Sequence, residues 1–146
     1  MRLTVDANVW IGALDIRDPA CAACRACLLK AAEHSAVLYS PLLLPVEVSA
    51  TVSRKTRDAR QGLLAVRWVR GFVGHLWQPL SEECAEEAER LAASLYLCGA
   101  DAVYVAVAHQ SEAVLLTCDA EVIERAAKTV RVMTPAAWLR LSDKRR

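Results

Sequence analysis

The sequence predicts an α/β fold in which a central, mostly parallel sheet lies between two layers of helices. Short apolar runs alternate along the chain with longer segments of helical periodicity, and several of the short runs are too apolar to have a solvent-facing side. Strands that alternate with helices form parallel sheets, because each helix returns the chain across a face of the sheet. With 146 residues, the chain has the length of one domain. We therefore expect a single three-layer α/β/α domain with about four to five strands.

Five short apolar runs are expected to form the strands, because each is only a few residues long and has little polar character. In chain order they are Arg2–Val5, Ala36–Tyr39, His75–Gln78, Ala113–Thr117 and Thr129–Val132. The segments between them are longer and have helical patterns. In chain order these predicted helices are Val9–Leu14, Pro19–Glu33, Leu43–Arg54, Ala59–Phe72, Ser81–Leu97, Ala102–Ser111 and Ala120–Ala127. The domain is expected to span residues 1–141, followed by a short basic tail over residues 142–146.

Composition excludes several classes of protein. Hydrophobic residues make up 55% of the chain, which is typical of a folded domain, and the formal net charge of +1 predicts no strong overall attraction to nucleic acids or membranes. No segment has the roughly 18 uninterrupted apolar residues of a membrane span, and no signal peptide precedes the first strand pattern. We therefore expect a cytoplasmic protein with no membrane partner, whose six cysteines are reduced thiols.

Four isolated acids, each set among apolar residues, are the candidates for a functional site. They are Asp6, Glu47, Asp101 and Asp119. An ionised carboxylate in a dry environment is costly unless it is paired or binds a cation. Asp6 and Asp119 follow predicted strands, and the other two stand near the beginnings of predicted helices. Active sites of open parallel sheets gather at the carboxyl ends of strands, so we expect all four acids at one edge.

Helix capping is the alternative role for two of these acids. Asp101 and Asp119 could each be an N-cap, because an Asp side chain there accepts a hydrogen bond from a free N–H group of the helix. Asp6 is harder to explain in this way, because it ends a strand. No lysine or arginine adjoins Asp6, Asp101 or Asp119 in the sequence. A cation is therefore the simpler partner for the four acids together.

The chain resembles the PIN-domain ribonucleases, and among them the VapC-like toxins of bacterial toxin–antitoxin pairs. The resemblance spans nearly the whole chain and is carried in order by Val5-Asp6-Ala7-Asn8-Val9, Asp15 to Ala26, Pro41 to Ser49, Gly99 to Ala108 and Leu115 to Asp119. It implies that Asp6, Glu47, Asp101 and Asp119 are the catalytic residues and bind Mg²⁺ or Mn²⁺ for RNA cleavage. Asn8 and Thr117 match positions where the family often has a hydroxyl residue, and they are expected to support the site. The resemblance also implies a homodimer and a cognate antitoxin.

The chemistry is consistent with these implications. Phosphodiester hydrolysis needs an attacking water, neutralisation of a highly charged transition state and stabilisation of the leaving oxygen. Hard divalent ions meet these needs, and carboxylate ligands without cysteine or histidine favour Mg²⁺ or Mn²⁺ over zinc. A PIN-like module that binds RNA or protein without cleavage is the alternative. A nucleotide-binding domain is less consistent with the sequence, because no glycine-rich loop follows the first strand.

A basic segment follows the predicted helix that contains Glu47. Its residues Arg54, Lys55, Arg57 and Arg60 are expected to bind RNA phosphates, although such a run could equally be a solvated helix face. An acidic helix surface is expected to face away from RNA, and it comprises Glu82, Glu83, Glu86, Glu87 and Glu89.

Cysteine, histidine and tryptophan residues give weaker signals. Cys21, Cys24 and Cys27 superficially resemble an iron–sulfur run but lack its fourth cysteine and trailing proline, so buried packing roles are expected. The scattered residues His34, His75 and His109 suggest ordinary core or surface roles. Most of the four tryptophans are expected in the core, and some could form an interface with a partner.

Overall fold

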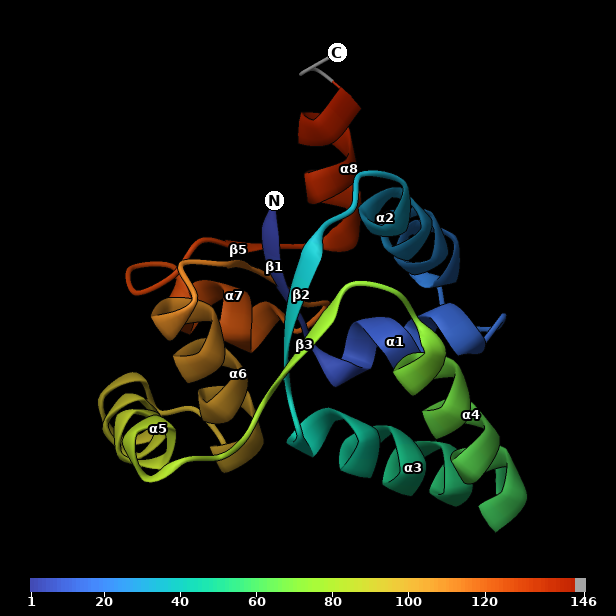
Figure 1. Cartoon of the computed structure of the whole chain (residues 1–146), viewed down its shortest axis with the longest axis horizontal. Helices are drawn as coiled ribbons and strands as arrows, with labels where there is room; N and C mark the ends of the chain where they lie inside the picture. The colour runs from blue at the N-terminus through green and yellow to red at the C-terminus, as the bar shows by residue number, and fades with distance from the viewer. Residues whose placement is uncertain (144–146) are drawn as a thin grey trace.

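A computed structural model of the protein describes residues 1–143 and confirms the α/β/α architecture. Five strands form one sheet in the order β3-β2-β1-β4-β5, and every neighbouring pair is parallel. The strands are β1 (Arg2–Val5), β2 (Val37–Pro41), β3 (His75–Gln78), β4 (Val114–Leu116) and β5 (Val132–Met133). In Figure 1, α1, α2 and α4 lie on one side of the strands, and α5, α6 and α7 lie on the other.

Helices α1 to α7 agree with the predicted segments to within about three residues at each end. They are α1 (Ala7–Leu14), α2 (Cys21–Glu33), α3 (Leu43–Thr56), α4 (Ala59–Gly71), α5 (Glu82–Leu95), α6 (Gly99–Gln110), α7 (Ala120–Ala126) and α8 (Pro135–Asp143). Central strands are the most deeply buried: Leu3 and Val5 of β1 and Leu115 of β4 have no exposed surface. The edge strands β3 and β5 are only partly buried. This gradient explains why the central strands are almost wholly apolar.

Helix α8 was not predicted, although its local sequence contains recognisable helix signals. Thr134 accepts a hydrogen bond from the Ala137 N–H at 3.1 Å, and Pro135 occupies the first helical position, where a missing N–H group costs nothing. Trp138 then buries its ring against the core. Ser142 and Asp143, which were expected in the tail, are the last residues of α8. The remaining residues of that tail, 144–146, lie outside the described part of the chain.

An aromatic cluster joins α1, α4 and β3. The buried Trp10 ring packs edge-on against Phe72 at a centroid distance of 5.1 Å and stacks on His75 at 5.4 Å. His75 also bonds to the Ser40 hydroxyl and to the Val69 carbonyl, each at 2.8 Å. Burial lowers the pKa of His75, which favours the neutral ring. This histidine therefore has the ordinary core role that was expected.

No single helix within residues 1–143 is long and apolar enough to span a membrane. Helices α5 and α6 reach the required length and composition only when they are taken together, and they are bent by 116° relative to each other.

Gly62 lets α3 and α4 approach each other closely, and this contact gives a test of the fold. A Cβ atom at position 62 would lie 2.1 Å from Ser53 Oγ and 2.7 Å from the backbone oxygen of Ser49. Gly62→Ala should therefore lower the free energy of unfolding by roughly 1–3 kcal/mol, measured by urea denaturation.

Gly71→Ala is the matched control in the same helix, because a Cβ there meets nothing within 4 Å. This change should be neutral or should stabilise by up to about 1 kcal/mol, since alanine favours helix more than glycine does. Equal effects of the two changes would contradict the close α3–α4 contact.

Candidate active site

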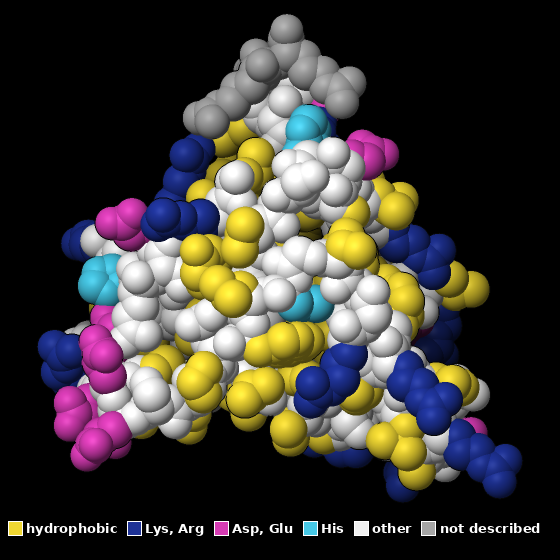
Figure 2. Space-filling view, viewed as in Figure 1, with side chains coloured by type: hydrophobic (Ala, Val, Ile, Leu, Met, Phe, Trp, Pro, Cys, Tyr) yellow, Lys and Arg dark blue, Asp and Glu magenta, His cyan; other side chains and the backbone are white. Residues whose placement is uncertain are grey.

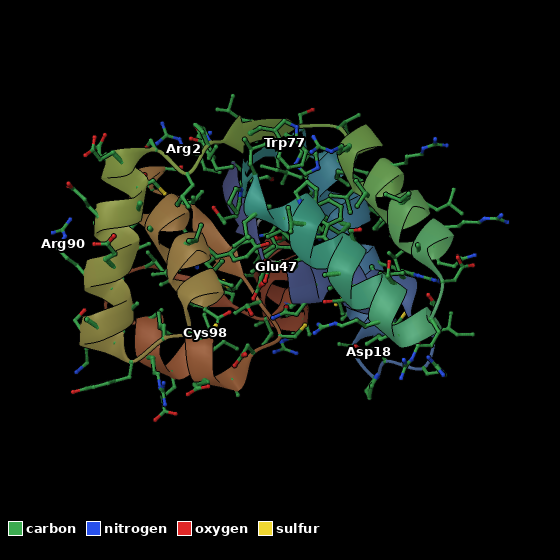
Figure 3. The ribbon with its side chains drawn as sticks, turned by 90° about the horizontal axis from the view of Figure 1, so that it is seen from below. Arg2, Asp18, Glu47, Trp77, Arg90 and Cys98 are labelled. Carbon is green, nitrogen blue, oxygen red and sulfur yellow. The ribbon has the colours of Figure 1, made fainter. Side chains whose placement is uncertain are left out.

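Strand order reverses between β1 and β4, and the candidate residues gather at the carboxyl ends of these two strands. Asp6 follows β1, and its N–H donates to the Leu116 carbonyl of β4 at 2.9 Å. Asp119 comes soon after β4 and begins α7. Glu47 lies in the second turn of α3, and Figure 3 shows it at the centre of the molecule, between α3 and α6. Asp101 lies in the first turn of α6. The predicted sheet edge is therefore the one where these acids lie.

The Thr117 hydroxyl connects the two strand ends. It donates to Asp6 Oδ2 at 2.7 Å and accepts from Asn8 Nδ2 at 2.9 Å and from the Asp119 N–H at 3.1 Å. A hydroxyl has one hydrogen to donate and two lone pairs, so these three bonds use its full capacity. Thr117 has no exposed surface, which makes its orientation a fixed part of the site. Thr117 therefore lies beside the candidate acids, as the sequence analysis expected, and its supporting role in the site remains a proposal.

Asn8 adds a second link between the strands. Its Nδ2 group donates to Asp6 Oδ2 at 2.7 Å, and its Oδ1 accepts the Cys118 N–H at 3.0 Å. The backbone donor at Cys118 fixes which amide atom faces which partner, because only oxygen can accept that bond. Asn8 and Thr117 together therefore hold one oxygen of the Asp6 carboxyl group in a defined place.

Burial makes Asp6 the most strongly perturbed of the four acids. Asp6 is only 6% exposed, and the pKa of its carboxyl group is raised from 3.8 to about 7. Desolvation is the main cause, the negative charges of Asp101 and Glu47 raise the pKa further, and the bond from Thr117 opposes them. Two of the other candidate acids are therefore close enough to repel Asp6.

Glu47 contacts a residue that the sequence analysis did not single out. Desolvation raises its pKa, and so does the charge of Asp101, while the Tyr104 hydroxyl lowers it. The pair lacks the geometry of a full hydrogen bond, so Glu47 Oε2 and Tyr104 Oη are both buried without a hydrogen-bond partner. Tyr104 lies one turn after Asp101 on α6 and is 1% exposed. Helical spacing from Asp101 was the one signal in the sequence that could have identified it.

The structure separates the capping alternatives for Asp101 and Asp119. Capping of α6 by Asp101 was wrong, because the N-cap is Cys98, whose thiol donates to Asp101 Oδ2 at 2.9 Å. Capping by Asp119 was right, since its Oδ1 accepts the N–H groups of Glu121 at 2.8 Å and Val122 at 3.3 Å. Those bonds engage one oxygen of Asp119, so a cap and a cation ligand are compatible roles for this residue.

The four acids fit a hard cation by their chemistry, although they do not form a ready-made ligand shell. Within residues 1–143, no three acidic, histidine or cysteine side chains are grouped closely enough to hold a metal ion, and none of the four acids is in an ion pair. Carboxyl oxygens that repel one another, together with the unpartnered Glu47 Oε2, match the preference of Mg²⁺ and Mn²⁺ for oxygen ligands.

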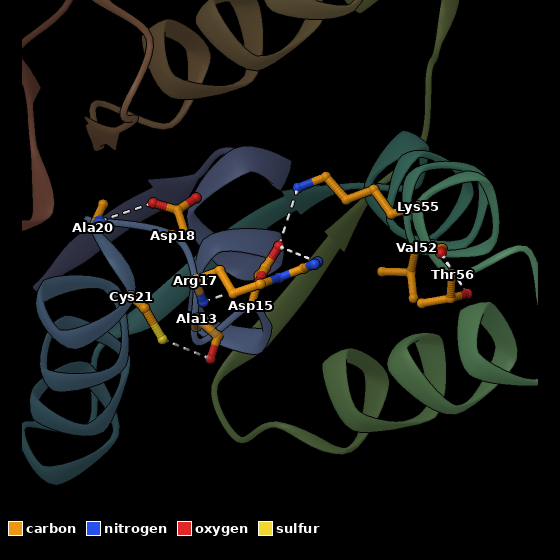
Figure 4. A network of polar contacts seen from close by, with 9 residues as sticks. All are labelled: Ala13, Asp15, Arg17, Asp18, Ala20, Cys21, Val52, Lys55 and Thr56. Atoms are coloured by element: carbon orange, nitrogen blue, oxygen red, sulfur yellow. Dashed lines mark hydrogen bonds and ion pairs between the residues drawn. The ribbon is translucent and has the colours of Figure 1, made fainter.

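The predicted RNA-binding residues lie around the loop between α3 and α4. Arg54, Lys55, Arg57 and Arg60 are all exposed. Lys55 also forms an ion pair with Asp15 at 3.7 Å, and this carboxylate binds Arg17 as well (Figure 4). Figure 2 shows Lys and Arg side chains over the part of the molecule where Figure 1 places α3 and α4. Asp and Glu side chains gather instead on the opposite side, over α5. Basic side chains thus predominate over α3 and α4, whereas acidic and some basic side chains lie together over α5. Binding of RNA to the basic surface remains a proposal.

The chain belongs to the PIN domain family, whose model matches residues 3–129. Its fold is also similar to that of VapBC2 from Rickettsia felis bound to a DNA fragment from their promoter, with a TM-score of 0.71, 15% identity and coverage of 92% of this chain and 98% of that chain. VapBC-1 from nontypeable Haemophilus influenzae has a TM-score of 0.68 at 14% identity, and the match covers 93% of this chain and 99% of that chain. FitAcB from Neisseria gonorrhoeae has a TM-score of 0.66 at 19% identity, and the match covers 92% of this chain and 98% of that chain. At these identities the likeness establishes the fold alone. No curated protein sequence matches the chain significantly.

The raised pKa of Asp6 predicts how stability depends on pH. Because the pKa is about 7 in the folded protein and 3.8 ordinarily, the folded chain retains a proton that the unfolded chain releases. The proton on Asp6 favours the folded state, and its contribution to stability is complete below pH 3.8 and is lost as the pH rises through about 7. Asp6→Asn should flatten that fall and raise the free energy of unfolding at about pH 8 by up to about 4 kcal/mol.

Urea denaturation in EDTA across this pH range measures the effect. Asp58→Asn is the control, because Asp58 caps α4 away from the site and an asparagine keeps the cap. Identical pH profiles for Asp6→Asn and the wild type would show that folding does not raise the pKa of Asp6.

Proposed function

We propose that this PIN-domain protein is a metal-dependent endoribonuclease and the toxin of a type II toxin–antitoxin pair. The observation that carries the proposal is the buried Asp6 carboxyl group, which faces two more acids and lacks a cationic side-chain partner within residues 1–143. A structural role would require such a charge to be paired, because burial of an uncompensated carboxylate is costly. A site that binds Mg²⁺ or Mn²⁺ explains why the fold tolerates it.

In this proposal, Asp6, Glu47, Asp101 and Asp119 hold the cation at the carboxyl edge of the sheet. A bound Mg²⁺ or Mn²⁺ would activate water and neutralise charge on the phosphate. Thr117 and Asn8 would act as positioning residues, because their hydrogen bonds orient Asp6 Oδ2. Tyr104 would orient Glu47 and exclude water from behind it, since both groups are buried against each other.

The basic segment supports the choice of a polyanion as substrate. Arg54, Arg57 and Arg60 are exposed near the end of the same helix, α3, that carries Glu47. Contacts between such side chains and phosphates hold a strand irrespective of its sequence. Lys55 would join them once its ion pair with Asp15 opens.

Partners and location follow from the same proposal. The similar structures include VapBC and FitAcB assemblies, and this supports a cognate antitoxin for our protein. A homodimer is proposed from the resemblance to the toxin family alone. We expect the pair to act in the cytoplasm, where RNA is accessible. The alternative function is a PIN-like module that binds RNA or protein without cleavage, and the absence of a ready-made ligand group within residues 1–143 favours it.

Neutral replacements of the acids separate these two functions. Asp101→Asn and Glu47→Gln should each reduce RNA cleavage in Mg²⁺ or Mn²⁺ by about 100-fold or more, because removal of a charged ligand weakens cation binding. Folding should be retained or improved, since charge repulsion at the site is relieved. Cleavage of a mixed RNA pool and thermal unfolding without metal are the measurements.

Asp143→Asn and Glu112→Gln are the matched controls, because they make the same chemical changes at acids outside both the acidic edge and the basic segment. Both should cleave RNA at the wild-type rate. Full activity in EDTA, or equal activity of Asp101→Asn and the wild type, would reject the nuclease proposal.

Replacement of the exposed arginines tests the binding surface. Changing Arg54, Arg57 and Arg60 together to glutamine should weaken RNA binding and reduce the slope of log affinity against log salt by about 0.7 for each lost phosphate contact. Binding would be measured by fluorescence anisotropy, with a single-stranded RNA and the Asp101→Asn protein. Changing Arg90, Arg131 and Arg140 to glutamine removes the same charge from other parts of the chain and should leave the slope nearly unchanged. Equal slopes for the two triple variants would exclude the basic segment as the RNA surface.

A further inference from the structure

A pair of cysteine thiols adjoins the acidic site. Cys118 lies between Thr117 and Asp119, and its sulfur is 3.7 Å from the sulfur of Cys24 on α2. Cys118 is exposed, whereas Cys24 has no exposed surface. The two residues are 94 positions apart in sequence, so only the fold brings them together. All six cysteines are free in the structure.

We propose that Cys24 and Cys118 are a thiol-oxidation site, at which a peroxide forms a reversible disulfide that disables the acidic edge. The environment of Cys24 suits this role, because its sulfur is closely packed. A Cβ atom at Gly12 of α1 would lie 3.3 Å from that sulfur, so α1 has a glycine where Cys24 packs against it. The buried thiol is therefore held in place beside an exposed one.

The reaction requires an oxidant such as hydrogen peroxide. The exposed Cys118 thiol reacts first, forming a sulfur–oxygen bond and releasing one water as the peroxide bond breaks. The Cys24 thiol then attacks the sulfur of this sulfenic acid, the sulfur–sulfur bond forms, and a second water leaves with the hydroxyl group. In total, two thiols lose two electrons and two protons, and one peroxide becomes two waters. A dithiol reductant reverses the reaction by exchange.

The new bond would disturb the hydrogen bonds at the end of β4. Bond formation requires the two sulfurs to approach by about 1.6 Å from their separation of 3.7 Å. Cys24 is fixed within α2, so the loop at Cys118 has to move. Its N–H donates to Asn8 Oδ1, and its neighbours are Thr117 and Asp119. Movement of Cys118 therefore withdraws support from Asn8 and shifts a proposed ligand, and the resulting loss of cleavage rests on the proposed function.

The chain supplies a matched control for Cys24. Cys27 lies one turn further along α2 and is equally buried, but it makes no sulfur–sulfur contact with Cys118. Cys98 is the other exposed cysteine, and its thiol bonds to Asp101. A Cys98→Ser background removes this second target of peroxide, and the activity of that reduced background protein is the reference.

The experiment treats the Cys98→Ser protein with hydrogen peroxide, blocks the remaining thiols and maps disulfides by mass spectrometry without reduction. We expect a crosslink between Cys24 and Cys118 in this background and in its Cys27→Ala derivative, with none in its Cys24→Ala derivative. Oxidation of the crosslinking proteins should lower RNA cleavage by about 10-fold or more, because the groups that orient a metal ligand are displaced, and dithiothreitol should restore it.

Absence of the Cys24–Cys118 crosslink, or a crosslink through Cys27 instead, would overturn the proposed site. A crosslinked protein that cleaves RNA at the reduced rate would overturn its effect on the acidic edge. If the reduced wild-type protein does not cleave RNA at all, the nuclease proposal fails on its own. Disulfide mapping then still tests the thiol pair, and Mn²⁺ affinity, expected to be about 10-fold weaker in the oxidised protein, replaces cleavage as the second readout.

Discussion

The hydroxyl group of Thr117 is the contact on which the acidic edge of this protein depends. Its three hydrogen bonds join the ends of β1 and β4, and one of them holds a carboxyl oxygen of Asp6 in a buried position. Strand order makes this possible, because β1 and β4 are neighbours at the point where the order reverses. Without such bonds, burial would keep Asp6 protonated to a higher pH, since Thr117 is the strongest influence that lowers its pKa. The same contact therefore fixes both the geometry and the charge of the site.

Charge repulsion among the acids opposes the folding of this edge. Asp101 and Glu47 raise the pKa of Asp6, and Asp101 also raises the pKa of Glu47. Within residues 1–143 no basic side chain forms an ion pair with these three acids. The apolar core on both faces of the sheet stabilises the fold enough to tolerate this repulsion. A bound divalent cation would relieve it, and metal binding would then also stabilise the folded state. In the absence of metal, the acids of the proposed nuclease site thus lower the free energy of unfolding of the protein.

Much of the architecture could be predicted from the sequence, because strand and helix patterns are local. The five strands, seven helices and common edge of the acids were predicted, and Asp119 indeed caps α7. Helix α8 was missed although the Thr134 cap and Pro135 at its first position are local signals of a helix. The capping role for Asp101 was wrong, since spacing alone does not show that Cys98 begins α6. Helical spacing from Asp101 could have placed Tyr104 near the site, but its contact with Glu47 joins distant segments, as does the contact of Cys24 with Cys118. Local patterns do not predict such contacts.

Binding of Mn²⁺ by isothermal titration calorimetry tests the central claim most directly, when it is repeated in buffers with different enthalpies of ionisation. In the metal-free protein the pKa of Asp6 is about 7, so below that pH a cation has to displace its proton. We predict that binding at about pH 6 releases about one proton for each ion and that this release disappears well above pH 7. Absence of binding, or binding with no release of protons at either pH, would contradict a cation site built on Asp6.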